Sequence, residues 1–231
     1  RQGNILAFAG RTIGKDKVKY INSKESEIFS KRRVLYGLNN FNKLNGKKPK
    51  YVFIVEGYTD VLMMNKYGLY NVVATMGTSL TLEHASEVKK ISNKVILCYD
   101  SDTAGIDSSF KNIEPLYQFG IEIFSLRLDS GLDPCSYLER HVREKFIDLA
   151  KKSSSIIDEY MDYLKDKLIE KEISINEALD SFVSKIRYVQ DYIQRDKFIN
   201  KFAASFSISK VKIESIINKE FIRADSPKQS I

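Results

Sequence analysis

The stretch "KVILCYDSDTAG", residues 94–105, decides the fold. Its first half is a run of apolar residues, and its second half places two aspartates, Asp100 and Asp102, at the end of that run. A short, near-continuous apolar run is typical of a strand that is covered on both faces of a parallel sheet. The stretch therefore predicts a buried strand that ends in two negative charges.

The sequence on both sides repeats this pattern of a strand followed by a helix. Further strands are expected at 51–57, 71–77 and 122–128, and helices between the strands at 58–68, 82–92 and 103–120. Strands that alternate with helical patterns are typical of βαβ units. We therefore predict an α/β fold with a parallel four-stranded sheet flanked by helices.

Composition divides the chain into three parts, 1–49, 50–138 and 139–231. The first is a basic α+β segment with strand-like pieces near its start and a helix expected around 30–43. The last has apolar residues at helical spacing and is predicted to be a helical subdomain. Its two apolar stripes are Ile156, Ile157, Tyr160, Met161, Leu164 and Leu168, and Leu179, Phe182, Val183, Ile186, Val189 and Ile193.

The positive charge of the chain is concentrated in its first part. The whole chain carries +7, whereas residues 1–49 hold 12 Lys or Arg and 3 Asp or Glu, a net charge of +9. Such an asymmetry favours a surface for a polyanion, which binds by phosphate neutralisation and counterion release. A solvated basic face is the alternative that a charge run alone leaves open.

Cysteine and histidine are too scarce for a disulfide framework or a structural zinc site, since the chain has two of each. Cys98 lies inside a predicted strand and is expected to be a small core residue. No apolar run approaches the roughly 18 residues of a membrane span, and no signal peptide is visible. We expect a cytoplasmic protein with no membrane partner, and, since residue 1 is Arg, a piece cut from a longer chain.

Acidic residues follow three of the four predicted strands. Glu56 ends the first strand, Asp100 and Asp102 end the third, and Asp129 and Asp133 follow the fourth. Because the carboxyl ends of parallel strands share one edge, these side chains should converge there and repel one another unless a cation is bound. Oxygen donors favour Mg²⁺ or Mn²⁺, and two such ions can serve phosphoryl transfer.

Each acidic residue also has a simpler interpretation when it is taken alone. An Asp-x-Asp pair often caps a helix or forms a solvated turn. Glu56 could cap the helix that follows it, and Asp60 could contact the positive end of the dipole of the same helix. The metal interpretation depends on the conjunction of acids at one sheet edge.

Several motifs of the sequence resemble those of a known family. "VEGYTDV" and "YDSDTAG" are similar to the toprim domain of primases, topoisomerases and some nucleases. The chain resembles the bacterial DNA primase catalytic core more specifically, through "FAGRTIG", "KYINSKESEIF", "KRRVLYG", "ATMGTSLT" and "GLDP". The resemblance covers roughly residues 1–140 and implies a toprim-type sheet at 50–138, with 1–49 as the later part of the basic subdomain.

The resemblance implies an enzyme, a DNA-directed RNA polymerase that makes short RNA primers on single-stranded DNA from NTPs during replication. It places Glu56, Asp100 and Asp102 in the catalytic metal site, where Glu56 is either a general base or a ligand. Further metal-site residues are Asp133, with Asp60 and Asp129 as auxiliaries, and the expected nucleotide and nucleic-acid contacts are Arg11, Lys19, Tyr20, Asn22, Lys31, Arg32 and Arg33.

The resemblance also sets expectations about cofactors and partners. Two or more Mg²⁺ or Mn²⁺ ions are expected during catalysis. The family's zinc-binding domain and helicase-interacting domain are not expected in this chain, so a replicative helicase would be a partner of the full-length protein at the replisome but not through this part.

Two other functions fit parts of the sequence. A toprim-family nuclease could use the same acids to activate water, although the basic segment argues against it. A non-catalytic nucleic-acid-binding module is the third possibility, because residues 202–217 faintly resemble a helix-turn-helix.

Overall fold

The computed structural model describes residues 4–12, 20–44, 48–99, 109–128 and 131–224. Its centre is a five-stranded sheet in the order β4-β3-β5-β6-β7, formed by Val72–Ala74, Val52–Val55, Lys94–Leu97, Glu122–Ser125 and Ser154–Ser155. The first four strands pair in parallel, so the predicted α/β fold with a parallel four-stranded sheet is confirmed. The short β7, which the sequence did not predict, pairs antiparallel with β6.

Helices cover both faces of the sheet because the parallel strands are apolar on both sides. One face packs against α2 (Leu82–Ile91) and α4 (Ile113–Gln118). The other packs against α1 (Tyr58–Lys66), α5 (Pro134–Arg140) and α6 (Arg143–Lys151). Successive residues at the end of β5 point to opposite faces of the sheet, Leu97 to the first face and Cys98 to the second. Cys98 is fully buried, as predicted for a core cysteine.

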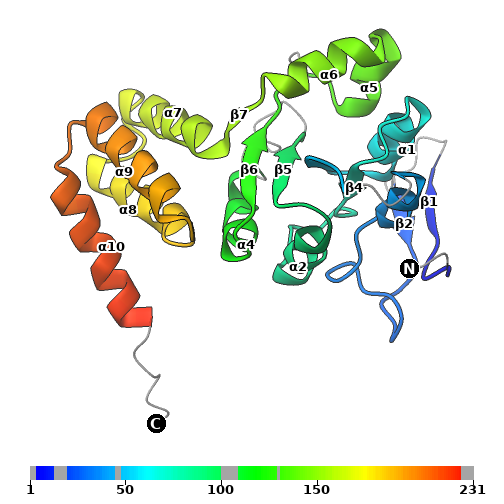
Figure 1. Cartoon of the computed structure of the whole chain (residues 1–231), viewed down its shortest axis with the longest axis horizontal. Coiled ribbons are helices and arrows are strands. Elements are labelled where there is room, and N and C mark those ends of the chain that lie inside the picture. The colour runs from blue at the N-terminus through cyan, green and yellow to red at the C-terminus, as the bar shows by residue number, and fades with distance from the viewer. Residues whose placement is uncertain (1–3, 13–19, 45–47, 100–108, 129–130, 225–231) are drawn as a thin grey trace.

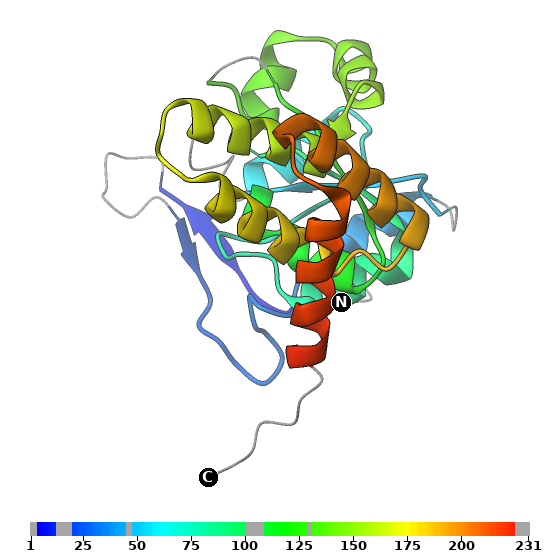
Figure 2. The same cartoon turned by 90° about the vertical axis from the view of Figure 1, so that its left-hand side faces the viewer.

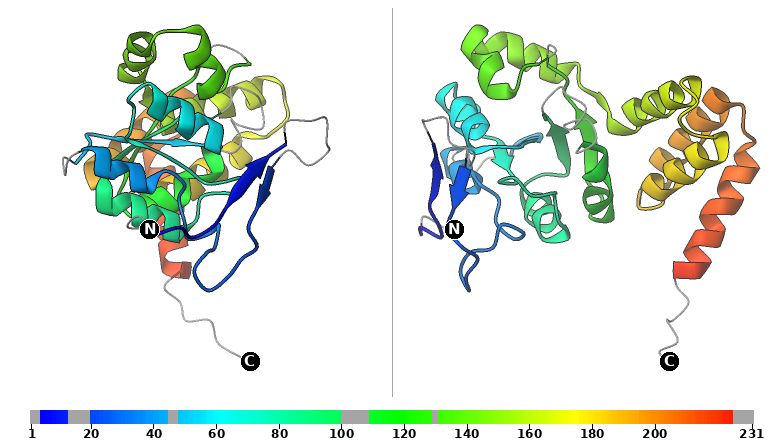
Figure 3. Two further views of the ribbon diagram at one scale, coloured as in Figure 1. Left: turned by 90° about the vertical axis from the view of Figure 1, so that its right-hand side faces the viewer. Right: turned by 180° about the vertical axis from the view of Figure 1, so that it is seen from behind.

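The helical part and the basic segment lie at opposite ends of the sheet (Figures 1 and 3). Figure 2, viewed from the helical end, shows α10 crossing beside α8 and α9. The helices are α7 (Ile156–Ile169), α8 (Ile175–Ile186), α9 (Tyr192–Phe206) and α10 (Lys210–Ala224). Their core is continuous with that of the first sheet face. No helix in the described part of the chain is long and apolar enough to cross a membrane.

The predicted apolar stripes are buried with two exceptions. Leu168 is partly buried near the end of α7. Ile193 is wrong as a core position, because its side chain is 66% exposed. Val189 ends the buried stripe in the loop after α8, and α9 then begins a new helix at Tyr192 with its own register.

The basic segment differs from its predicted form. It contains an antiparallel hairpin of β1 (Ala9–Arg11) and β2 (Tyr20–Asn22) and a 3-10 helix, η1 (Leu38–Leu44). The helix expected around 30–43 is therefore wrong over its first part. There the chain is extended at Tyr36, which exchanges two main-chain hydrogen bonds of 3.0 Å with Ala74.

Gly37 allows the chain to turn away immediately after this bridge. Its φ is +87°, a conformation that L side chains rarely adopt. A Cβ atom here would lie 2.8 Å from Val61 Cγ1 and 2.9 Å from the carbonyl oxygen of Val72. There is thus no room for a side chain at residue 37, where the basic segment meets the sheet edge.

We predict that Gly37→Ala lowers the free energy of unfolding by about 2 to 4 kcal/mol, from backbone strain and overpacking. Gly10→Ala is the matched control, since nothing lies within 4 Å of its added Cβ atom. Urea unfolding of the two variants measures the difference. Equal stability of both variants would contradict the tight joint at residue 37.

Candidate functional site

The acidic edge of the sheet is built where β3, β5 and β6 end. Glu56 follows β3 and immediately precedes Gly57, the N-cap of α1. Beyond β5, the Cys98 amide donates to the Ile54 carbonyl at 2.9 Å, so β5 and β3 stay together up to the point where Asp100 follows. The acids expected here that lie outside the described residues are Asp100, Asp102 and Asp129.

Glu56 lies close to the end of β5. Its side chain is half-buried, and its Oε1 atom is shielded from solvent. Burial raises the pKa of Tyr99, and the negative charge of Glu56 raises it further. Glu56 thus lies within electrostatic range of Tyr99, the last described residue before Asp100.

Asp60 joins two helices rather than facing solvent. Its side chain is 4% exposed. Its Oδ2 accepts a hydrogen bond of 3.1 Å from the amide of Gly57, and its Oδ1 accepts one of 3.3 Å from the amide of Cys135. Asp60 thus closes the first turn of α1 and holds the start of α5 beside it, which favours the structural interpretation of this residue.

Asp133 caps α5. Its Oδ1 accepts a hydrogen bond of 2.6 Å from the amide of Ser136, and the following Pro134 occupies the first turn. Because α5 is held to α1 through Asp60, the carboxylate of Asp133 lies at the same end of the sheet as Glu56. A cap uses one carboxylate oxygen and leaves the other geometrically available to a ligand.

The charges that shift the pKa of Cys135 show which residues surround the acidic corner, the end of the sheet where Glu56, Asp60 and Asp133 lie. Burial, and then the negative charges of Asp133, Glu139 and Asp60, raise the pKa of its thiol to about 11, and Arg11 opposes them. The thiol is therefore protonated at neutral pH, and thiolates rather than thiols bind metals. Arg11 of β1 also lies within electrostatic range of the acidic corner.

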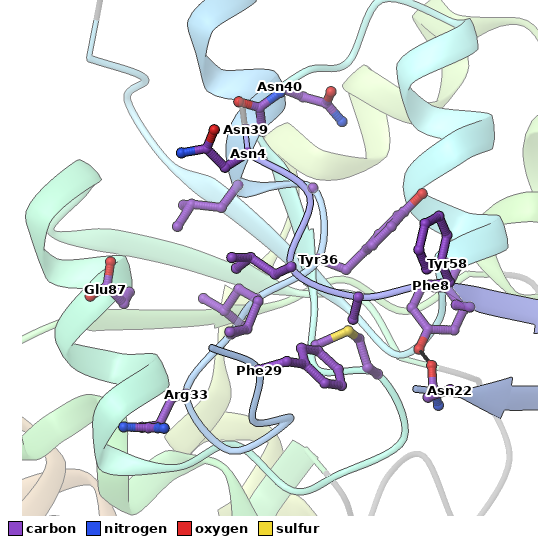
Figure 4. Close-up of a pocket in the computed structure, with 18 residues that line it drawn as sticks. Asn4, Phe8, Asn22, Phe29, Arg33, Tyr36, Asn39, Asn40, Tyr58 and Glu87 are labelled. Carbon is purple, nitrogen blue, oxygen red and sulfur yellow. Dashed lines mark hydrogen bonds between the residues drawn. The ribbon is translucent and has the colours of Figure 1, made fainter. Parts of the chain in front are cut away.

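A direct contact connects the hairpin with the acidic edge. The hydroxyl of Tyr58, two residues after Glu56, donates a hydrogen bond to Oδ1 of Asn22 on β2 (Figure 4). Arg11 pairs with Tyr20 across the hairpin. Lys19 and the side chain of Tyr20 lie outside the described residues.

Lys31, Arg32 and Arg33 lie farther along the basic segment, in a turn. The Lys31 amide donates to Oε1 of Glu25 at 3.0 Å, and the Arg33 amide to the carbonyl of Ser30. Hydrogen bonds from Ser30 and from Lys31 lower the pKa of Glu25, which therefore stays charged beside this turn. The side chains of Arg32 and Arg33 are exposed.

A pocket of about 310 Å³ separates Arg33 from Asn22. Figure 4 shows Arg33 on one side of it and Asn22 with Tyr58 on the other. Tyr36, which also lines the pocket, meets Tyr58 edge to face with ring centroids 4.8 Å apart. The structure therefore brings Arg11 and Asn22 to the acidic corner and places the Lys31–Arg33 turn apart from them.

Among the described residues, no group of three or more Asp, Glu, His or Cys side chains is arranged to hold a metal ion. The carboxylates of Glu56 and Asp133 still fit a hard divalent cation, which prefers oxygen donors. Sequence reasoning missed Tyr58 and the polar residues His84 and Asn112, which lie behind the site. The hydroxyl of Thr81 followed three positions later by a polar side chain is a capping signal that could have identified His84.

Comparisons with known proteins match two parts of the chain to known families. Residues 53–138 match the Toprim-like family, and residues 1–42 match the N-terminal domain of the DNA primase catalytic core. The DNA primase of Staphylococcus aureus is 34% identical over 209 residues, which are 90% of this chain and 34% of that protein. The chain thus spans about a third of the length of the curated relatives it matches.

Solved structures show the same fold. The Aquifex aeolicus primase, with its zinc-binding and RNA polymerase domains, has a TM-score of 0.76 and 28% identity, over 92% of this chain and 51% of that one. A DnaG primase catalytic domain bound to ssDNA has a TM-score of 0.75 and 27% identity, over 88% and 66% of the two chains.

We predict that Asp60→Ala lowers the free energy of unfolding by about 2 to 4 kcal/mol, because it leaves two main-chain amides without their acceptor. Leu62→Ala, an exposed position on the same helix, should change it by less than about 0.5 kcal/mol. Urea unfolding without divalent ions gives both values. An Asp60→Ala variant as stable as Leu62→Ala would contradict the structural role and favour a metal-binding one.

Proposed function

We propose that the chain carries the nucleotidyltransferase machinery of a primase, because it belongs to the family of bacterial DNA primase catalytic cores with a Toprim domain. The activity is the synthesis of short RNA primers on single-stranded DNA from NTPs during replication. The observation that carries the proposal is the hairpin with Arg11 and Asn22, bonded through Tyr58 to the strand end that presents Glu56. A cationic and a carboxylate surface are thus joined at one corner.

The three parts of the chain have separate tasks in this proposal. Residues 1–49 bind nucleotide and nucleic acid, 50–138 hold the metal, and 139–231 support the sheet from its other end. We propose that the protein acts in the cytoplasm, at the replisome, and that a replicative helicase contacts the full-length protein outside this chain.

Membership in the Toprim primase family implies the use of a divalent metal. We propose Mg²⁺ or Mn²⁺, two or more during catalysis, held by Glu56, Asp100, Asp102 and Asp133. Asp129 is an auxiliary residue, and Asp60 orients the start of α5 that carries Asp133. The bound metal would supply charge stabilisation for phosphoryl transfer.

The chain's own residues position the reactants. Arg11, Lys19 and Asn22 would hold the triphosphate and ribose beside the acidic edge, where positioning and electrostatics supply most of the catalysis. Glu56 acts either as general base toward the 3′-hydroxyl or as a ligand. Tyr20 and the turn Lys31, Arg32 and Arg33 would contact template or nucleotide. The ssDNA bound to the related catalytic domain supports a single-stranded template as partner.

We predict that the Asp100→Ala, Asp102→Ala double variant loses Mn²⁺ binding, and that wild-type binding strengthens with ATP. Calorimetric titration with Mn²⁺, with and without ATP, measures both. The control is Asp148→Ala, Asp162→Ala, which removes two exposed carboxylates from α6 and α7 and should bind as the wild type does. Undiminished Mn²⁺ binding by the Asp100, Asp102 variant would contradict the metal site.

We predict that Lys19→Ala weakens binding of a single-stranded oligonucleotide and reduces the salt dependence of log K by a slope of about 0.7, as expected for one lost phosphate contact. Lys212→Ala, an exposed cation on α10, is the control. Fluorescence anisotropy over a salt series measures the slopes.

The same pair of variants separates the proposed function from a DNA-binding module. A loss confined to Lys212→Ala would favour the helix pair α9–α10 as the binding element and contradict the hairpin. Nicking of a labelled strand in place of primer extension would favour a Toprim nuclease.

A further inference from the structure

The turn that begins α2 lies between the two halves of the site. Residues 80–84 contact the Lys31–Arg33 turn on one side and, through Asn112, the end of β5 on the other. The two hydrogen bonds of Asn112 are buried, and buried polar groups that are paired hold a unique geometry, whereas the bond to the basic turn is exposed.

Thr81 and His84 form a reciprocal cap that also reaches the basic segment. The His84 amide donates to Thr81 Oγ1 at 3.1 Å, and the Thr81 amide donates to His84 Nδ1 at 3.3 Å. The hydroxyl of Thr81 donates to the carbonyl of Arg32 at 2.6 Å. One residue of the cap thus fixes the main chain of the basic turn directly.

The imidazole of His84 faces the same turn. The residue is fully buried, and its Nε2 atom is shielded from solvent and makes no hydrogen bond with any described residue. Because Nδ1 accepts a hydrogen bond, the proton of the neutral ring is on Nε2. Main-chain groups of Lys31 and Val34 favour the protonated ring, although burial outweighs them and lowers the pKa of His84. The ring therefore lies beside the main chain of the basic turn, without a hydrogen bond from Nε2 to it.

Asn112 makes the connection on the other side. Its Oδ1 accepts a hydrogen bond of 2.9 Å from the amide of Leu80, and its Nδ2 donates one of 2.7 Å to the hydroxyl of Tyr99. Asn112, Leu80 and Tyr99 are each less than 5% exposed. Tyr99 is the residue directly before Asp100, so this bond ends at the strand that carries the Asp-x-Asp pair.

We propose that the turn 80–84 fixes the distance between the Lys31–Arg33 turn and the carboxylate edge, with His84 and Asn112 as positioning residues for nucleotidyl transfer. The proposal rests on the proposed function, which gives both surfaces a task. A cap that served only α2 would need neither the hydroxyl bond to Arg32 nor a buried ring packed beside residues 31–34.

Two substitutions at one position separate positioning from simple capping. In His84→Asn, the amide oxygen can replace Nδ1 as acceptor for Thr81 but cannot reach the basic turn. In His84→Gln, the longer side chain can also fill the space beside residues 31–34 that the Nε2 side of the ring occupies. If His84 positions the basic turn by packing against it, Gln retains single-stranded DNA binding and Asn loses about tenfold in affinity, because the shorter side chain leaves the space beside the turn unfilled.

The measurements are anisotropy with a single-stranded oligonucleotide, Mn²⁺ calorimetry and hydrogen exchange of the Arg33 and Val34 amides, which both donate to Ser30. We expect faster exchange and weaker DNA binding in His84→Asn alone, with Mn²⁺ affinity unchanged in both His84 variants. Asn112→Leu should give the opposite result, with weaker Mn²⁺ binding and an unchanged salt slope for DNA.

Equal DNA affinity and equal exchange in His84→Asn and His84→Gln would overturn the proposal. Uniform loss of Mn²⁺ and DNA binding in every variant would also overturn it, because this would indicate a general loss of stability. If the wild type binds neither Mn²⁺ nor DNA, the proposed function fails. Hydrogen exchange at Arg33 and Val34 would still show whether His84 holds the turn.

Discussion

The parallel pairing of β3, β4, β5 and β6 is the constraint on which the remaining structure depends. It directs the carboxyl end of every one of these strands to the same edge. It also requires apolar residues on both strand faces, which is why helices cover both sides of the sheet. A charged residue directly after any of these strands therefore lies at this carboxyl edge, as Glu56 does after β3.

Carboxylates gathered in this way need compensation, and the fold supplies it from two directions. Main-chain amides at the starts of α1 and α5 pair with Asp60 and Asp133. The hairpin carries Arg11 to the same corner through the Asn22–Tyr58 contact. The remaining carboxylate charge is what a divalent cation would balance. The composition shows the same division, because the net charge is +9 in residues 1–49 and −2 in the rest of the chain.

The sequence allowed the sheet to be predicted because buried parallel strands have a strong local signal. Strand ends were shorter than expected, as at β3, because Glu56 and Gly57 already belong to the turn into α1. The two-residue β7 has no apolar run and exists only through pairing with β6. The helix expected around 30–43 failed because the bridge from Tyr36 to Ala74 overrides local helical propensity.

The types of residue in the candidate site could be predicted from the sequence, but their hydrogen-bond partners could not. Family motifs indicated Asn22 and Asp60, whereas their bonds to Tyr58 and Cys135 join residues that are 36 and 75 positions apart. Such long-range polar contacts leave no periodic pattern in a single sequence. The same holds for Asn112, whose two bonds depend on how α2 and the start of α4 pack.

A metal site at the carboxyl edge can be located by NMR of the labelled chain during addition of Mn²⁺, whose paramagnetism broadens nearby signals. We predict early broadening of the amide signals of Gly57, Cys135 and Ser136 at this edge. The signals of Asn71 and Ile121, which precede β4 and β6 at the opposite edge, should stay sharp. Broadening that begins at Asn71 or Ile121, or that affects all these signals equally, would contradict a metal site at the carboxyl edge.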